Sequence, residues 1–408
     1  MVHGASPQRQ AGESANGGNM SHECRGALLL ATSISLAGVV WTPPVSAIDL
    51  NGIKITPSIS YTGEYDDNVF RAQFNKRSDY SNTYSPGVTV EANPGKHELK
   101  ALYRADFIRY LSHPTNDSDR HTASLLAKFN FNRLAARFSE EFRRTDDFPT
   151  TELTTRIRRN ENTTTGGFDY DVFQVWGVGF DVARANVHYL RSDFDFLGRN
   201  SYTYATNVYY RVATKTRMFA EYNFVREIFE FDKSRDNIRH RGLLGVNGEL
   251  TERLHMAAKL GYEHLDFHDL SRNSQGNFVT SIDANYRPVE RLGIGLSLNR
   301  SVESSTFTGN PQFENFMTNL SITYALTPKV TLIPSGFFGV GLYRESATNI
   351  DRLEKRVDYN YGGGLGIRYE LQKWIRLEGN YAFSRRDSNF NSNDYDDNRV
   401  SFTLTLSM

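Results

Sequence analysis

Residues 97–111 read HELKALYRADFIRYL, and this stretch decides the fold. Its apolar residues fall on every second position, as Leu99 and Tyr103 show, while Lys100 and Arg104 fall between them. Successive side chains of a β-strand point to opposite faces, so this strand has one apolar face and one charged face. An α-helix would need apolar residues three or four positions apart. The stretch therefore predicts a strand that separates an apolar environment from a polar one.

The same period of two recurs along almost the whole chain from Lys54 onward. Clear further examples are residues 202–211, 278–287, 292–299 and 358–370. Short polar turns, such as Asn93-Pro94-Gly95-Lys96, alternate with longer polar segments, such as residues 146–159 and 345–355, which are expected to form loops. This alternation predicts about eighteen strands, with about sixteen as the alternative.

The alternating lengths of the connections distinguish two classes of all-β protein. A soluble β-sandwich has no reason to sort its loops in this way, whereas an outer-membrane barrel has short periplasmic turns and longer external loops. A closed sheet also pairs every backbone group inside the bilayer. The predicted fold is therefore all-β, a transmembrane antiparallel up-and-down β-barrel. Eighteen strands would enclose a space about 35 Å across, which side chains cannot fill.

The composition excludes several other classes of protein. The chain has 408 residues, of which 23% are charged, and it lacks the runs of about 20 apolar residues that membrane helices need. Its 22 Tyr and 27 Phe are too many for a disordered chain. Lys plus Arg equals Asp plus Glu at 47 each, so no overall field favours nucleic acid. A single cysteine, Cys24, allows no disulfide framework.

The N-terminal segment is typical of a secretory signal. Residues 27–41 are apolar, Arg25 precedes them, and Val45-Ser46-Ala47 forms a small-residue cleavage site. We therefore expect residues 1–47 to be a signal peptide with an N-terminal extension, and residues 48–408 to be the exported barrel. A single anchor helix is the alternative, and Met20 is an alternative start.

The charged face of the strands predicts a wet interior. The lumen-facing candidates are Lys100, Arg104, Asp106, Lys128, Arg137, Glu141, Arg143, Arg211, Glu221, Arg239, Arg241, Lys259, Glu263, Asp283, Arg368, Arg376 and Glu378. Rings of charge set the solute preference of a pore. Opposite charges on adjacent strands could equally pair for structural reasons, and both interpretations stay open at this point.

One motif occurs twice, as Tyr65-Asp66-Asp67-Asn68 and as Tyr395-Asp396-Asp397-Asn398. The first copy ends the opening strand and the second begins the closing strand, so a closed barrel makes them neighbours. Carboxylate and amide oxygens are ligands that Ca²⁺ prefers. The residues Asp66, Asp67, Asn68, Asp396, Asp397 and Asn398 are therefore candidates for a Ca²⁺ site, and the alternative is a turn motif beside an unrelated acidic loop. We expect no other cofactor.

Several short sequence motifs resemble those of one protein family. The segment Tyr65–Arg71 (YDDNVFR) is followed by Ser78-Asp79, by Ser85-Pro86-Gly87-Val88 and by the segment Gly95–Leu99. Their order resembles the Putative beta-barrel porin 2 family. The resemblance implies an outer-membrane barrel, often associated with exopolysaccharide or capsule export, with a periplasmic polysaccharide-export protein as a partner.

The end of the chain, Val400–Met408, alternates to its last residue. It resembles the terminal strand by which barrel-assembly machinery recognises its substrates. That signal usually ends in Phe, whereas this sequence has Met408 at that position.

Three functions are consistent with these observations. The first is export of polysaccharide through a barrel held in outer-membrane lipids. The excess of Arg over Lys suggests an anionic polymer, and the alternative explanation of this excess is a GC-rich genome. The second is a passive porin for small solutes. The third is a non-conducting surface barrel that binds glycans through the loop aromatics Phe148, Phe194, Phe196, Phe307 and Phe313. No nucleophile motif, metalloprotease motif or phosphate-binding loop occurs, so we do not expect an enzyme.

Overall fold

The computed structural model describes residues 48–149, 152, 154–269, 272–305, 312–349 and 352–407. The predicted signal peptide and Met408 lie outside these residues. The strands are β1 (Ile48–Leu50), β2 (Ile53–Asp66), β3 (Asp79–Ala92), β4 (Glu98–Tyr110), β5 (Ser118–Asn130), β6 (Leu134–Thr145), β7 (Arg159–Asp171), β8 (Trp176–Tyr189), β9 (Arg199–Ala213), β10 (Thr216–Phe229), β11 (Asn237–Thr251), β12 (Leu254–Phe267), β13 (Gln275–Val289), β14 (Leu292–Ser304), β15 (Gln312–Ala325), β16 (Val330–Asn349), β17 (Arg352–Gln372), β18 (Ile375–Ser388) and β19 (Tyr395–Ser407).

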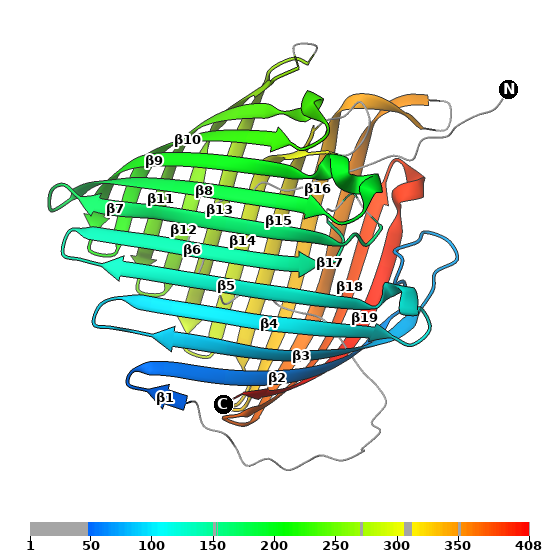
Figure 1. Cartoon of the computed structure of the whole chain (residues 1–408), viewed down its shortest axis with the longest axis horizontal. Helices are drawn as coiled ribbons and strands as arrows, with labels where there is room; N and C mark the ends of the chain where they lie inside the picture. Colours follow the sequence, from blue (N-terminus) through cyan, green and yellow to red (C-terminus); the bar gives the residue numbers. More distant parts are fainter. Residues whose placement is uncertain are drawn as a thin grey trace.

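The strands from β2 to β19 form one closed antiparallel ring of eighteen strands (Figure 1). Each strand pairs with the next in the sequence, and β19 returns to pair with β2, from Arg399 opposite Asp66 to Ser407 opposite Ser58. The short β1 pairs with the start of β2. The prediction of an up-and-down barrel with eighteen strands is confirmed.

Short turns and both described ends of the chain lie at one end of the barrel. In the turn after β3, Gly95 takes a φ of 64° and His97 donates its backbone N–H to the carbonyl of Pro94 at 3.2 Å. The longer connections lie at the other end and contain the short 3-10 helices η1 (Pro114–Asn116), η2 (Ser192–Leu197), η3 (Lys233–Arg235) and η4 (Asn391–Asn393). Since short turns face the periplasm in outer-membrane barrels, the end with the longer loops is the extracellular mouth.

One predicted loop is wrong. Residues 345–355 were expected to form a long polar loop, but β16 and β17 continue to Asn349 and from Arg352, with Ser346 opposite Lys355. The pairing resumes after an irregularity between Leu342 and Ser346. Polar residues interrupt a strand only inside the bilayer, where its outward face must be apolar. This hairpin extends beyond the apolar band, so its polar residues remain paired.

Candidate functional site

The charged face of the wall lines the interior of the barrel. Arg137 of β6 donates to Asp181 of β8 at 2.5 Å, and Lys259 of β12 donates to Glu221 of β10 at 2.8 Å. Each of these pairs spans an intervening strand, and side chains can converge in this way on the concave face. The cross-strand registers place all seventeen predicted lumen-facing residues on this face.

Most of these charges are neutralised by a carboxylate or a cation on the wall. Four ion pairs join two predicted residues, namely Arg104–Asp106, Lys259–Glu221, Arg241–Glu263 and Arg368–Glu378. Most others pair with carboxylates that the sequence did not single out, which are Glu91, Glu98, Glu161, Asp169, Asp171, Asp181, Glu227 and Glu370. Among the described residues, Glu141 and Asp283 have no ion pair. The wall therefore presents mainly neutral pairs, and a selective role for any single residue stays a proposal.

The loop between β6 and β7 extends across the extracellular mouth. We call residues 146–149, 152 and 154–158 the crossing loop. Its Glu152 carboxylate accepts hydrogen bonds from the hydroxyls of Ser305, at 2.9 Å, and Tyr343, at 2.5 Å. Ser305 follows β14 and Tyr343 belongs to β16, on the opposite side of the ring from β6. A loop that reaches the far wall must divide the opening.

The far-wall contact of Glu152 is enclosed by aromatic and basic side chains. The Tyr343 ring stacks on Phe313 with centroids 5.1 Å apart, and the Arg356 guanidinium lies 4.9 Å from the centroid of the Tyr343 ring. Burial raises the pKa of the Glu152 carboxyl, while Arg356 and the hydrogen bonds from Tyr343 and Ser305 act in the opposite direction. Burial prevails, so Glu152 holds its proton more tightly when the crossing loop is docked.

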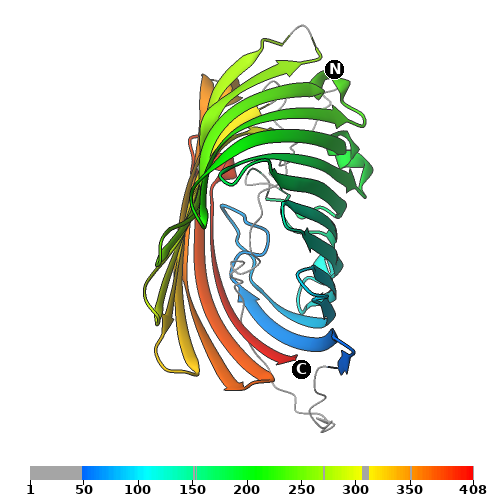
Figure 2. The ribbon, with the colours of Figure 1, turned by 90° about the vertical axis from the view of Figure 1, so that its left-hand side faces the viewer.

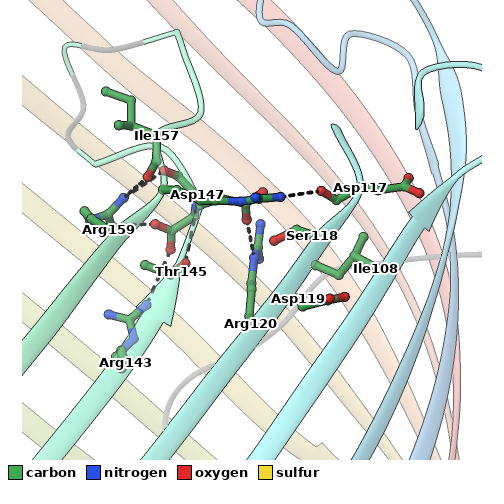
Figure 3. Close-up of polar contacts among 12 residues, drawn as sticks. Ile108, Asp117, Ser118, Asp119, Arg120, Arg143, Thr145, Asp147, Ile157 and Arg159 are labelled. Carbon is green, nitrogen blue, oxygen red and sulfur yellow. Dashed lines mark hydrogen bonds and ion pairs between the residues drawn. The ribbon is translucent and has the colours of Figure 1, made fainter. Parts of the chain in front are cut away.

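The near end of the crossing loop is held by arginines of the wall (Figure 3). Arg159 donates to the Asp147 carboxylate at 2.5 Å and to its backbone carbonyl at 2.9 Å, and Arg120 donates to Asp146 at 2.6 Å. Burial would raise the pKa of Asp147, but Arg159, Arg120 and Arg143 outweigh it, and the pKa lies below its ordinary value. Asp147 therefore stays ionised and fixes the base of the loop.

A second loop, residues 67–78, also folds into the barrel, where Figure 2 shows it inside the outline of the ring. Its Arg71 guanidinium lies 3.8 Å from the centroid of the Phe148 ring, and Arg156 lies 4.8 Å from the same centroid. Phe148 and Arg156 belong to the crossing loop, so the two loops meet there. Among the described residues, neither guanidinium has an ion pair.

The two Tyr-Asp-Asp-Asn copies are neighbours, as predicted. The backbone N–H of Asp67 donates to the carbonyl of Asn398 at 3.1 Å, and carboxylate oxygens of Asp66, Asp67 and Asp397 lie within 4.8 Å of one another. The other three candidate ligands have different partners. The Asn68 side chain bonds to the backbone of Ala72 and Asp396, the Asn398 amide donates to Asp67 at 2.8 Å, and Asp396 pairs with Lys76. The structure thus brings three of the six residues together, and the Ca²⁺ site stays a proposal.

The loop aromatics considered for glycan binding have partners within the protein. Phe148 lies between two guanidiniums, and Phe194 and Phe196 pack against the buried cluster of Ile157, Tyr189 and Leu197. Phe313 belongs to β15 rather than to a loop, and Phe307 lies outside the described residues. This packing is easily missed from sequence, because a loop segment carries no sign of the wall that it will meet.

No helix among the described residues is long and apolar enough to cross a membrane. Residues 53–408 match the model of the family described as Putative beta-barrel porin 2. Among curated proteins nothing matches the chain.

Several solved barrels align with most of the chain at low sequence identity. OccAB3 of Acinetobacter baumannii has a TM-score of 0.47 and 9% identity, over 87% of this chain and 99% of that chain. OpdO of Pseudomonas aeruginosa has a TM-score of 0.49 and 10% identity, over 87% and 97%. The outer membrane channel DcaP of Acinetobacter baumannii has a TM-score of 0.45 and 13% identity, over 89% and 100%. Because the family model covers nearly all of the barrel, the chain belongs to the Putative beta-barrel porin 2 family and is an outer-membrane β-barrel.

Proposed function

We propose that the barrel conducts polar solutes across the outer membrane and that the crossing loop sets the width of its mouth. The docking of Glu152 on Ser305 and Tyr343 of the far wall carries this proposal. A lumen lined by ion pairs favours water and polar solutes over apolar ones. A loop anchored at both walls restricts what passes until it moves.

For the cargo, we propose an anionic polysaccharide that moves outward, as the family resemblance suggests. Arg71 and Arg156 support this choice, because their guanidiniums lie at the mouth and have no ion pair among the residues described. A guanidinium binds carboxylates and phosphates through two parallel hydrogen bonds. The chain carries no motif for nucleotide binding, so a periplasmic polysaccharide-export protein would deliver the polymer.

Passive diffusion of small solutes is the second candidate. The divided mouth favours it, because a small molecule needs less of the opening than a polymer does. Both candidates require a conducting pore, whereas a surface glycan-binding barrel does not.

Two measurements test these proposals. The purified barrel in a planar lipid bilayer should give discrete conductance steps, and their absence would contradict both candidates. Deleting the gene should reduce secreted polysaccharide and leave small-solute uptake unchanged. Unchanged polysaccharide with reduced uptake would exclude export and leave the passive porin.

A further inference from the structure

The outer surface of the barrel changes character sharply on β8. Its outward side chains are apolar from Trp176 to Val182, and the next outward residue is Arg184, followed by Asn186 and His188. Arg184 lies eight positions from Trp176, which corresponds to about 20 Å along the membrane normal for a tilted strand. The apolar band of such barrels is about 25 Å tall. Arg184 is therefore close to the headgroups of the outer leaflet.

Neighbouring strands extend this polar surface. Arg226 of β10 lies opposite Tyr202, and Tyr202 lies opposite Arg184, so the two guanidiniums flank one tyrosine. Two strand spacings separate the Cα atoms of the arginines by about 10 Å. Arg184 also donates to the side-chain oxygen of Asn200 at 3.0 Å. On β6, Arg144 extends the same face toward the mouth.

The charge of this surface is only partly balanced by the protein, because Glu140 of β6 lies in the outward row of Thr164 and Arg184, and Glu230 lies 3.5 Å from His188. Among the described residues, Arg144, Arg184 and Arg226 have no carboxylate within 4.0 Å. Outward arginines elsewhere on the barrel do have one, since Arg109 pairs with Asp119 at 2.8 Å and Arg385 pairs with Asp387 at 2.7 Å. Arginines at the membrane interface without an acidic partner attract anionic headgroups.

An apolar hollow lies below Arg184, on the side of β8 that faces away from Arg226. It has a volume of about 460 Å³ and is lined by Leu134, Ala136, Gly166, Gly167, Phe168, Phe180 and Val182 of β6, β7 and β8. Gly166 lies opposite Val182, and it leaves room because a Cβ there would meet only Val182, at 3.8 Å. Val182 is the outward neighbour of Arg184, so the hollow continues from the charged surface toward the middle of the membrane.

We propose that this wall binds a phosphate-bearing lipid of the outer leaflet. The phosphate lies between Arg184 and Arg226, where guanidiniums can donate paired hydrogen bonds, and an acyl chain occupies the hollow beside Gly166. The position of the cations above the apolar hollow matches the order of headgroup and acyl chain in that leaflet. A second copy of the chain fits less well, because a symmetric interface would bring identical positive surfaces together.

The test uses the full barrel in detergent, titrated with bis-phosphorylated lipid A, with the same lipid lacking phosphate, and with inorganic phosphate, and analysed by native mass spectrometry. Retention of bis-phosphorylated lipid A should fall at least about tenfold in R184Q/R226Q, because each interfacial cation contributes roughly fivefold. Gly166→Leu should reduce retention by filling the hollow without any change of charge.

Two matched variants complete the test. R109Q/R385Q removes outward arginines that have acidic partners, and Gly242→Leu adds a side chain at an outward glycine with open space around it. Both should retain the lipid within twofold of the wild type. Equal retention in R184Q/R226Q, equal retention of the lipid lacking phosphate, or competition by inorganic phosphate at matched concentration would each overturn the proposal. So would a lipid-independent dimer that the arginine substitutions abolish.

Discussion

Ion pairs line both halves of the lumen, but they are solvated very differently. Near the periplasmic turns, the side chains of Lys128 and Glu98 are 37% and 39% exposed at an N–O distance of 2.9 Å. Near the mouth, those of Arg239 and Glu227 are 1% exposed at 2.8 Å. Residues of the same type therefore play a structural role where they are covered, and remain accessible to a solute where they are not.

The largest effect should come from removing a buried carboxylate at the mouth. Glu227 contacts Arg199 at 3.0 Å and Arg239 at 2.8 Å. Glu227→Ala leaves two buried guanidiniums without this charge, which should lower the free energy of unfolding by about 3–5 kcal/mol. Urea unfolding of the barrel in lipid vesicles measures this value. Glu249→Ala, in an exposed pair with Lys215, is the control and should cost less than about 1 kcal/mol. Equal losses of unfolding free energy in the two variants would mean that buried and exposed ion pairs do not differ in their structural role.

The next effect concerns the crossing loop. Glu152→Ala removes the acceptor for Ser305 and Tyr343, so the loop should leave the far wall and single-channel conductance should rise at least about twofold. Glu141→Ala removes a lumen carboxylate that has no ion pair among the described residues, and should leave conductance nearly unchanged. An unchanged conductance in Glu152→Ala would mean that the loop does not limit the pore.

The pH dependence follows from the same carboxyl. Its pKa is raised in the docked loop from an ordinary value of 4.5. Protonation therefore stabilises docking, fully below the ordinary pKa, and this stabilisation is lost as the pH rises through the raised pKa. Conductance should fall on acidification across that interval in the wild type. Glu152→Gln should show no such change, and a persisting pH response would assign it to another group.

A smaller effect is expected for the exposed pairs near the periplasm. Glu98→Gln should change the free energy of unfolding by less than about 1 kcal/mol, because solvent screens the pair. It frees the positive charge of Lys128, so the reversal potential in a salt gradient should shift toward anion preference. A large loss of stability without a shift in reversal potential would contradict the conclusion that the ion pairs near the periplasmic turns are accessible to solutes.

The smallest effect is expected at the junction of β2 and β19. Calorimetry should detect weak heat of Ca²⁺ binding, and Ca²⁺ should raise the melting temperature by a few degrees in the wild type but not in D66N/D397N. Asp119→Asn on the outer surface is the control. Absence of heat, with the same melting temperature in chelator, would leave the paired motif as a purely hydrogen-bonded junction.

The sequence by itself determined the barrel, its strand number and the face on which each charge lies. Alternation along His97–Leu111 is a local property, since neighbouring side chains on a strand must point to opposite faces. The paired Tyr-Asp-Asp-Asn motif even located the closing strands. The prediction was wrong at residues 345–355, because polar residues can continue a paired hairpin outside the membrane.

Only the tertiary structure decided which charges are paired and which loops enter the lumen. Asp181 reaches Arg137 across a strand, and Glu152 reaches Tyr343 across the barrel, although neither pair has a signature in the sequence. Such contacts depend on the register and curvature of a closed sheet, which bring together residues from distant parts of the chain. The same closure leaves Arg184 and Arg226 facing the lipid without an acidic partner among the residues described.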